Sequence, residues 1–253
     1  MLSSAFLDAL TIARDELAIE IADTHDQILE AQRLRHLVYC EEHDFLVGKD
    51  GIEEDEFDVH SRHILVRSRG SRIVYGTVRV VLSGEYGIGF PMQRVCDAHV
   101  LQPFCHQQIG EISRFAVTRD RAGISSAASA LMRLFLIRGI VHVSGECGLT
   151  HWCATMERTL LRLLRTTAIH FEPVGKPIEY HGIRQPAFYS LSRGLPQIRS
   201  EHPYIWNFLT AEGTLWSDEL ATSRATALSN VKEIVAAHFP YRPGVFRAVR
   251  DAA

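Results

Sequence analysis

The chain has 253 residues, which at about 150 residues per domain predicts one enlarged domain or a domain with an appendage. Hydrophobic residues make up 46% and charged residues 23%, and these ordinary globular values exclude disordered, collagen-like and coiled-coil classes. The formal net charge is −3, and no run of basic residues occurs. Both features argue against a partner held through many phosphates, such as a nucleic acid.

The cysteines and the amino terminus indicate a reducing compartment. The five cysteines are widely spread and none forms a C-x-x-C pair, so we expect reduced thiols rather than a zinc site or a disulfide scaffold. The first residues lack a basic segment and include Asp8 and Asp15, which is not the pattern of a secretory signal. The longest apolar stretch is interrupted by Arg133 and Arg138, which argues against a membrane span. We predict a cytoplasmic protein and leave contact with a membrane surface open.

The first elements expected are a strand over 16–22 and the helix that follows it. Thr24 and Gln27 have the spacing of a capping box at the start of this helix. Apolar residues at intervals of three and four then give the helix one buried face. Arg35 lies beside that face, so its guanidinium must reach solvent or a buried acid.

An acidic turn precedes a series of strands in the middle of the chain. Strands are expected over 63–67 and 72–82, joined by a hairpin-like connection, and Arg79 lies in the second. A further strand over 110–118 reads G-E-I-S-R-F-A-V-T. Strict alternation would separate two sets of side chains on its two faces: Glu111, Ser113 and Phe115 on one, and Ile112, Arg114 and Ala116 on the other.

The remaining elements complete an α+β pattern. A long helix is expected from Ser125 or Ser126 to about 139, and the later elements are a weak strand over 149–153, a helix over 155–165, and strands over 169–174 and 185–191. This order predicts one mixed sheet flanked by helices. Residues from 194 onward carry prolines, Trp206, Trp216 and one helical stretch over 218–238. We therefore predict a core over 1–193 and an appendage over 194–253.

Several common catalytic patterns are missing. The chain has neither the G-x-S-x-G elbow of serine hydrolases nor a phosphate-binding loop of the G-x-x-x-x-G-K-[ST] type. His60 and His63 are spaced by three residues, but at a strand edge rather than on a helix. No metal site is predicted.

Charged residues inside apolar elements are the informative feature of the sequence. They are Arg35, Asp55, Asp58, Arg79, Glu111 and Arg114. Charge in such places is costly unless it is paired or catalytic. One interpretation is a buried network of ion pairs that fixes the first helix to the sheet. The other is a polar pocket for a small molecule with a carboxylate, which arginine would bind through its planar fork. The two are compatible.

Ordered motifs extend this interpretation. The chain resembles the acyl-homoserine-lactone synthases and the long-chain N-acyl amino acid synthases over about residues 17–192. The matching residues are Arg35-His36-Leu37-Val38-Tyr39, Phe45, Asp55 and Asp58, Gly76-Thr77-Val78-Arg79, and Glu111-Ile112-Ser113-Arg114-Phe115. Three blocks are most similar to the acyltransferases associated with PEP-CTERM/exosortase systems: R-x-x-V-Y-C-x-E-x-x-F-L from Arg35, E-R-T-L-L-R-L-L-R from Glu157, and F-E-P-V-G-K-P-I-E-Y-H-G-I-R-Q-P-A-F-Y from Phe171.

The resemblance implies a GNAT-like fold and an acyl transfer reaction. The donor would be an acyl-phosphopantetheine thioester on acyl carrier protein, the acceptor an amino acid or related small amine, and no bound cofactor would be needed. Glu111 would be the general base, with Arg114 and Asp58 also catalytic. Substrate binding would fall to Arg35, Tyr39, Phe45, Asp55, Arg79, Phe115 and Val117. Backbone amides near 115–118 would hold the oxyanion, and direct aminolysis would explain the missing nucleophile motif.

Departures from related patterns refine these expectations. Coenzyme-A-dependent members of the wider fold hold pyrophosphate on a glycine-rich loop, whereas residues 119–124 here contain one glycine. This favours a carrier protein over free coenzyme A, with Arg119 and Arg121 either contacting the carrier or forming a solvated turn. Phe45 stands where lactone-forming relatives tend to have tryptophan, which makes an acyl-homoserine-lactone-type synthase the alternative. A non-catalytic acyl-binding module on the same fold is the other alternative. His181 is either a pocket residue or a surface turn residue.

Overall fold

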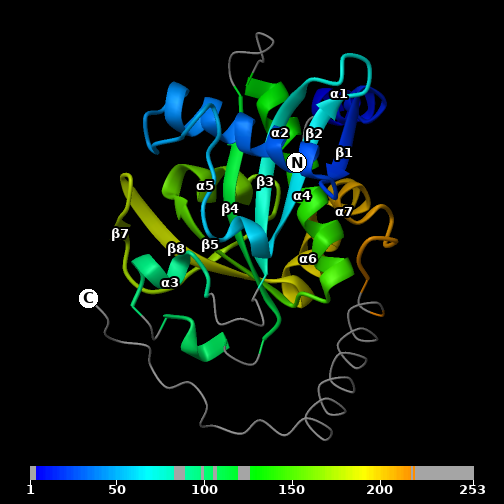
Figure 1. Ribbon diagram of the computed structural model, residues 1–253. Helices are drawn as coiled ribbons and strands as arrows, with labels where there is room; N and C mark the ends of the chain where they lie inside the picture. Colours follow the sequence, from blue (N-terminus) through cyan, green and yellow to red (C-terminus); the bar gives the residue numbers. More distant parts are fainter. Residues whose placement is uncertain are drawn as a thin grey trace, which may run out of the picture.

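A single mixed sheet forms the centre of the computed structural model, which describes residues 4–82, 89–97, 100–104, 107–118, 126–217 and 219 (Figure 1). Within these residues eight strands lie in the order β1-β2-β3-β4-β5-β8-β6, with β7 paired to β8. The strands are β1 Leu17–Ile21, β2 Ser61–Ser68, β3 Val74–Leu82, β4 Ile109–Val117, β5 His151–Glu157, β6 Glu172–Pro173, β7 Ile178–Glu179 and β8 Ile183–Ser190. Only the pair β4 and β5 is parallel, so the predicted α+β class with a mostly antiparallel sheet is confirmed.

Helices cover both faces of this sheet, as Figure 1 shows for α2 and α4. The helices are α1 Ser4–Glu16, α2 His25–His36, α3 Met92–Val95, α4 Ser126–Cys147, α5 Arg158–Arg165, α6 Leu191–Glu201 and α7 Pro203–Thr210. Alternate residues of each strand face opposite layers. Ile64 and Val78 belong to the large hydrophobic cluster that contains the α4 side chains, whereas Leu65 packs with Ala31 and Leu34 of α2.

The start of α2 follows the sequence prediction. The backbone N–H of Gln27 donates to Thr24 Oγ1 at 3.3 Å, and the backbone N–H of Thr24 donates to Gln27 Oε1 at 3.2 Å. These two bonds form the predicted capping box. The preceding helix α1 was not predicted; its buried residues are Leu10 and Ala13.

The bounds of three later elements differ from the prediction. α4 continues past Gly139 to Cys147. A Cβ at position 139 would lie 2.4 Å from Ile64 Cγ2, so this glycine lets the helix approach the sheet closely. β5 extends to Glu157, and the helix predicted from 155 therefore begins at Arg158. Only Glu172–Pro173 of the strand predicted over 169–174 pairs with the sheet.

α4 is the one helix in the described part of the chain that could cross a membrane by length and composition, over Ala128–Cys147. Its most apolar window is 67% buried within the protein. The helix packs on β1, β2, β3 and β4, which is the arrangement of a core helix.

The segment after β8 packs on the core as far as residue 217. Leu195, Ile198, Trp206 and Trp216 are buried in the same hydrophobic cluster as α4. α6 also runs across the predicted boundary at 193/194. The division into a core and an appendage stays a prediction, and the helical stretch predicted over 218–238 lies outside the described residues, apart from 219.

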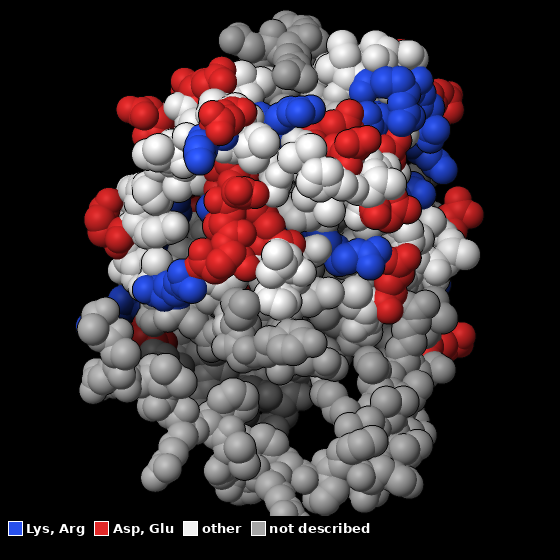
Figure 2. Space-filling model, viewed as in Figure 1, with Lys and Arg blue, Asp and Glu red and all other residues white. Residues whose placement is uncertain are grey.

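On the face seen in Figure 2, acidic and basic side chains are intermingled, with a dense acidic group near the centre. The small net charge of −3 therefore reflects many charges of both signs rather than few charges.

Candidate active site

The sheet opens between β4 and β5. Their parallel pairing covers only Ile109–Glu111 with His151–Cys153. Beyond this point β4 stays with β3 up to Val117, while β5 stays with β8 up to Glu157. The two central strands therefore part after Glu111, and this leaves space within the sheet for a ligand.

Two adjoining cavities occupy this opening. The larger, here called the apolar cavity, has a volume of about 500 Å³, and side chains such as Ile137, Ile140, Trp152, Leu160 and Phe171 line it. The smaller, here called the base cavity, has a volume of about 150 Å³ and contains Glu111 in its wall. Both cavities share a common wall made of Tyr39, Phe45, Ile112, Ser113, Arg114, Thr155 and Arg184.

Glu111 is a buried carboxyl group without an arginine partner within hydrogen-bond distance in the described residues. Its side chain is 2% exposed. The backbone N–H of Met92 donates to its two carboxyl oxygens at 2.9 and 3.1 Å. Burial raises the pKa of Glu111 to about 8, although the Met92 hydrogen bond and the charges of Arg79 and Arg114 act in the opposite direction. A carboxyl group with such a pKa can take up and release a proton near neutral pH.

A cluster of ion pairs lies next to the base cavity. Arg35 binds Glu53 at 2.5 Å and Asp58 at 2.7 Å. Arg79 binds Asp55 at 2.5 Å and Asp58 at 2.7 Å. Arg114 closes the cluster by binding Glu53 at 2.8 Å and Asp55 at 2.9 Å. Three arginines and three acids thus neutralise one another, and both Arg35 and Arg79 are 0% exposed. We call these six residues the ion-pair cluster.

The charges of the ion-pair cluster are fixed near neutral pH. Burial alone would raise the pKa of Asp58, but hydrogen bonds and charges from Arg35 and Arg79 hold it well below its usual range. His63 lies beside the cluster, with its Nε2 at 3.6 Å from Asp58 Oδ1. Burial lowers the pKa of His63 to about 4, and the nearby arginines add to this effect. The imidazole is therefore neutral at pH 7.

A bulge in β4 turns Arg114 toward the ion-pair cluster. Between the pairs Thr77–Ala116 and Arg79–Ser113, one residue of β3 lies opposite two residues of β4, Arg114 and Phe115. Arg114 has a φ of 52°, which is uncommon for a residue with a side chain. The strict alternation predicted for this strand is wrong at this point, because Arg114 joins the Ser113 face. Phe115 faces the hydrophobic cluster and the apolar cavity instead.

The end of α2 positions the aromatic residues of the shared wall. After His36 the helix continues as a π-helical segment, Leu37–Glu42, a local geometry that is frequent at functional sites. The carbonyl oxygen of Tyr39 accepts hydrogen bonds from the backbone N–H groups of Phe45 at 2.7 Å and Leu46 at 3.2 Å. These bonds fold the chain back on itself, so that Tyr39 and Phe45 line the cavities together.

The residues predicted from the sequence fall into two groups. Glu111, Arg114, Tyr39, Phe45, Phe115 and Val117 line the cavities. Arg35, Asp55, Asp58 and Arg79 do not line them and instead form the ion-pair cluster, which agrees with the interpretation of these charges as a buried network. Their contact with substrate stays a prediction. Arg119 and Arg121, with the whole loop over 119–124, lie outside the described residues.

The sequence did not reveal Glu53 as a member of the ion-pair cluster, and it predicted the backbone amide of Thr118 as an oxyanion donor although that amide already has a partner. Glu53 is 3% exposed and bridges Arg35 to Arg114. Only its place in an acidic run could have indicated it, and every acid in that run gives the same signal. The N–H of Thr118, expected among the oxyanion donors, already donates to the carbonyl oxygen of Tyr75 at 3.1 Å. His181 is exposed in a turn with φ 49° and also lines the base cavity.

Metal and disulfide chemistry have no visible basis in the residues that can be described. Cys40, Cys96, Cys147 and Cys153 are present as thiols. The same residues contain no group of three histidine, cysteine or acidic side chains that could hold a metal ion.

Comparison with known proteins identifies the family. The family model described as "N-acyl amino acid synthase FeeM" matches residues 30–190, which include the whole ion-pair cluster, Glu111 and both strands of the opening. The chain belongs to the FeeM family of N-acyl amino acid synthases. No curated protein sequence matches the chain. The family assignment agrees with the resemblance found in the sequence motifs. The match does not test the predicted association with PEP-CTERM/exosortase systems.

Solved structures share the fold of this FeeM-family chain. FeeM, an N-acyl amino acid synthase from uncultured soil microbes, superposes with a TM-score of 0.51 and 13% identity, over 72% of this chain and 94% of that one. The acyl-homoserine-lactone synthase LasI gives 0.54 and 18%, over 69% and 89%. The coenzyme-A-dependent lactone synthase MesI gives 0.55 and 20%, over 74% and 95%. At these identities the likeness is one of fold, and the chain has the GNAT-like acyltransferase fold that was predicted.

Proposed function

We propose that this protein moves a long-chain fatty acyl group from acyl carrier protein to the amine of an amino acid or a related small amine. One observation carries the proposal: buried Glu111 lies in the wall of the base cavity, which adjoins the apolar cavity where β4 and β5 part. The apolar cavity, at about 500 Å³, falls within the range of about 300–1,000 Å³ for small-molecule sites. It would hold the acyl chain, and the base cavity would hold the acceptor.

The reaction would be a direct aminolysis of the thioester. The acceptor nitrogen attacks the thioester carbonyl carbon, and Glu111 accepts a proton from that nitrogen. Backbone N–H groups of β4 on the side facing the opening would stabilise the oxyanion. The C–S bond then breaks, the amide C–N bond remains, and the departing thiolate takes the proton that Glu111 accepted, which returns Glu111 to its ionised form. This sequence needs neither a covalent enzyme intermediate nor a bound cofactor.

Arg114 would connect the reaction centre with the ion-pair cluster. Its side chain reaches both cavities, while Glu53 and Asp55 hold its guanidinium through four hydrogen bonds. Burial works against its charge, but these acids raise the pKa of Arg114 well above its ordinary value. A fixed positive charge at this point would bind the acceptor's carboxylate or stabilise the developing oxyanion. Arg35, Arg79 and Asp58 would then act as positioning residues for Arg114.

Three finer parts of the proposal rest on sequence features. The blocks that begin at Arg35, Glu157 and Phe171 support membership of the acyltransferases associated with PEP-CTERM/exosortase systems. The single glycine in 119–124 supports acyl carrier protein over coenzyme A as donor. The five scattered cysteines, none of which forms a C-x-x-C pair, support a reducing, cytoplasmic location.

Mass spectrometry of lipid extracts from an expressing host tests the proposal. Cells that make the wild-type chain should accumulate N-acyl amino acids or amines that are missing from cells making the Glu111→Gln variant. Purified protein should then use a long-chain acyl carrier protein thioester faster than the matching coenzyme A thioester. With S-adenosylmethionine as acceptor no lactone is expected. Binding of the acyl donor without turnover for any acceptor would favour a non-catalytic acyl-binding module instead.

A further inference from the structure

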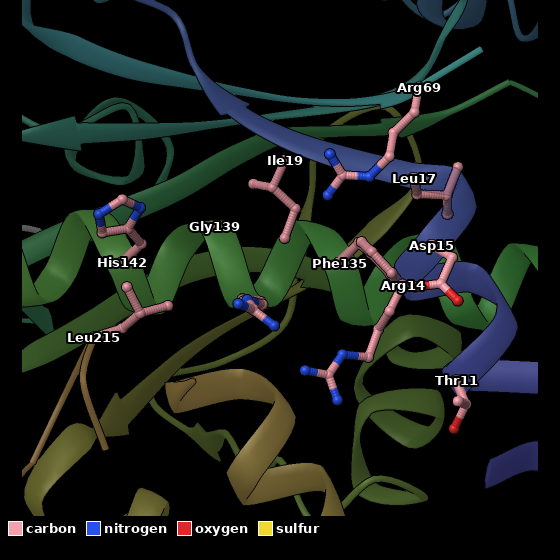
Figure 3. Close-up of a pocket in the computed structure, with 11 residues that line it drawn as sticks. Thr11, Arg14, Asp15, Leu17, Ile19, Arg69, Phe135, Gly139, His142 and Leu215 are labelled. Carbon is pink, nitrogen blue, oxygen red and sulfur yellow. The ribbon is translucent and has the colours of Figure 1, made fainter. Parts of the chain in front are cut away.

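A third cavity lies on the other side of α4, away from the opening in the sheet. Its volume is about 560 Å³, and its walls come from α1, β1, the turn after β2, α4 and the segment around Leu215. Figure 3 shows Arg14 and Arg69 extending from different elements, with their guanidinium groups on opposite sides of the α4 ribbon in this view. Arg138 of α4 lines the same space. We call it the arginine cavity.

The arginine cavity and the apolar cavity use opposite faces of α4. Phe135, Arg138, Gly139 and His142 line the former, a spacing of three, four and seven residues that places them on one helix face. Arg133, Ile137 and Ile140 line the latter. At about 100° per residue, the two sets point in roughly opposite directions. The arginine cavity is therefore separate from the proposed acyl transfer site.

The positive charge in the arginine cavity is not balanced. Its ionisable lining consists of Arg14, Arg69 and Arg138 against the single acid Asp15, together with His142. Within the described residues no ion pair joins any of these three arginines to an acid. His142 already has a partner, because its Nε2 lies 3.4 Å from Glu146 Oε1. Every arginine of the ion-pair cluster, by contrast, is bound to two acids.

The surroundings of Arg138 in this cavity shift the pKa of its guanidinium. It is half-buried, and its guanidinium stacks over the Phe208 ring at 5.1 Å. Burial lowers the pKa of Arg138, and the nearby charge of Arg14 lowers it further. Two like charges that face one cavity, neither joined to an acid by an ion pair in the described residues, repel each other, and a bound anion would offset that repulsion.

We propose that the arginine cavity binds a small organic anion that carries at least two phosphoryl groups. Its volume falls within the range of about 300–1,000 Å³ that is usual for small-molecule sites. The three guanidinium groups come from three different elements and outnumber the acid by two, which suits a ligand with several negative oxygens. Planar guanidinium forks match phosphate oxygens through paired hydrogen bonds. Leu17, Ile19 and Phe135 supply apolar surface for the organic part of the ligand.

Calorimetric titration of the full chain tests this proposal, with inorganic pyrophosphate and ADP as probes. Saturable binding of both probes is expected, with ADP the tighter because its nucleoside adds apolar contact. The double variant Arg14→Gln/Arg69→Gln should weaken the binding of both probes by at least about tenfold, because each substitution removes charge-assisted hydrogen bonds to the phosphoryl oxygens. Both residues are exposed, so the variant should fold, which circular dichroism checks.

Two matched controls separate the cavity from general charge and from the acyl transfer site. Arg33→Gln/Arg158→Gln removes the same charge from two exposed positions outside the cavity and should leave probe affinity unchanged. Glu111→Gln should also leave it unchanged, whether or not the proposed acyl transfer is correct. The proposal would be overturned by an absence of saturable binding at millimolar probe, by equal weakening in the control pair, or by citrate binding as tightly as pyrophosphate.

Discussion

Two sets of carboxyl groups lie near each other in this fold, one made of Glu53, Asp55 and Asp58 and the other of Glu111 alone, yet their surroundings are opposite. Glu53, Asp55 and Asp58 are each bound by two arginines. Glu111 is bound by one backbone N–H group. The arginines keep the first three ionised, whereas burial raises the pKa of Glu111 to about 8, so that its protonated and ionised forms coexist around that pH.

This difference in surroundings assigns a structural role to Glu53, Asp55 and Asp58 and a chemical role to Glu111. A carboxylate held between arginines cannot exchange its proton near neutral pH, so its charge serves the architecture. A carboxyl group with a pKa near the working pH can do so, and Glu111 alone among these four acids lines a cavity. The acid without an arginine partner is therefore the one to test for catalysis.

The largest expected effect comes from removing the proton acceptor. Glu111→Gln keeps the shape of the side chain and should lower the rate of acyl transfer by about 10²–10⁴-fold, the usual contribution of a general base. The melting temperature should not fall, because an amide needs no charge in this buried place. Steady-state assays with saturating acyl donor measure the rate. A variant with wild-type turnover would show that another group accepts the proton.

Breaking the ion-pair cluster should lower the free energy of unfolding. Arg79→Met leaves Asp55 and Asp58 without one of their two arginines, and loss of a buried partner typically costs about 3–5 kcal/mol. Urea denaturation measures this change in the free energy of unfolding. Arg62→Met is the control, because Arg62 pairs with Glu146 at 3.4 Å on the surface, and exposed pairs contribute at most about 1 kcal/mol. Similar losses in both variants would contradict a structural role for the cluster.

The two groups of carboxylates should also respond to pH with opposite signs. Unfolded glutamate ionises near pH 4.5, whereas folded Glu111 does so only near 8. The native state thus retains a proton over this range, and the wild-type chain should lose stability relative to Glu111→Gln as the pH rises through it. The difference is on the order of a few kcal/mol, at about 1.4 kcal/mol per pKa unit. Parallel stability curves for the two proteins would refute this assignment.

Acid pH should test the other group. The pKa of Asp58 is depressed from an ordinary value of 3.8, so its contribution to stability is present above that value and is lost as the pH falls further. Asp58→Asn should remove this acid-sensitive part of the unfolding curve. A curve that keeps the wild-type loss below pH 3.8 would assign it to other carboxylates.

The smallest expected effect concerns acyl chain length. Leu160 lines the apolar cavity from α5, and Leu160→Phe should shorten the preferred acyl chain by occupying part of its volume. One added or missing methylene is worth only about 1–3 kcal/mol in an apolar pocket. Competition between acyl donors of different length, followed by mass spectrometry of the products, measures the shift. Leu163→Phe on the same helix does not line the cavity and should leave the preference unchanged.

Local signals in the sequence predicted much of this fold. The capping box at Thr24, the strands around Arg79 and Glu111, and the α+β order all depend on neighbouring residues, and all are present. The buried charges were also recognisable, because Arg35 and Arg79 interrupt apolar faces. The sequence did not show which acid pairs with which arginine. Glu53 is indistinguishable in sequence from the exposed Glu54 beside it, and only the fold shows that it lies between Arg35 and Arg114.

The bulge at Arg114 determines which face of the sheet each later side chain of β4 occupies. If the same residues followed strict alternation without the bulge, every side chain from Arg114 onward would lie on the opposite face of the sheet. Phe115 and Val117 would then turn toward the acids of the ion-pair cluster, away from the apolar cavity that they line. One inserted residue thus lets a single strand present charge to one layer of the protein and an apolar wall to the other.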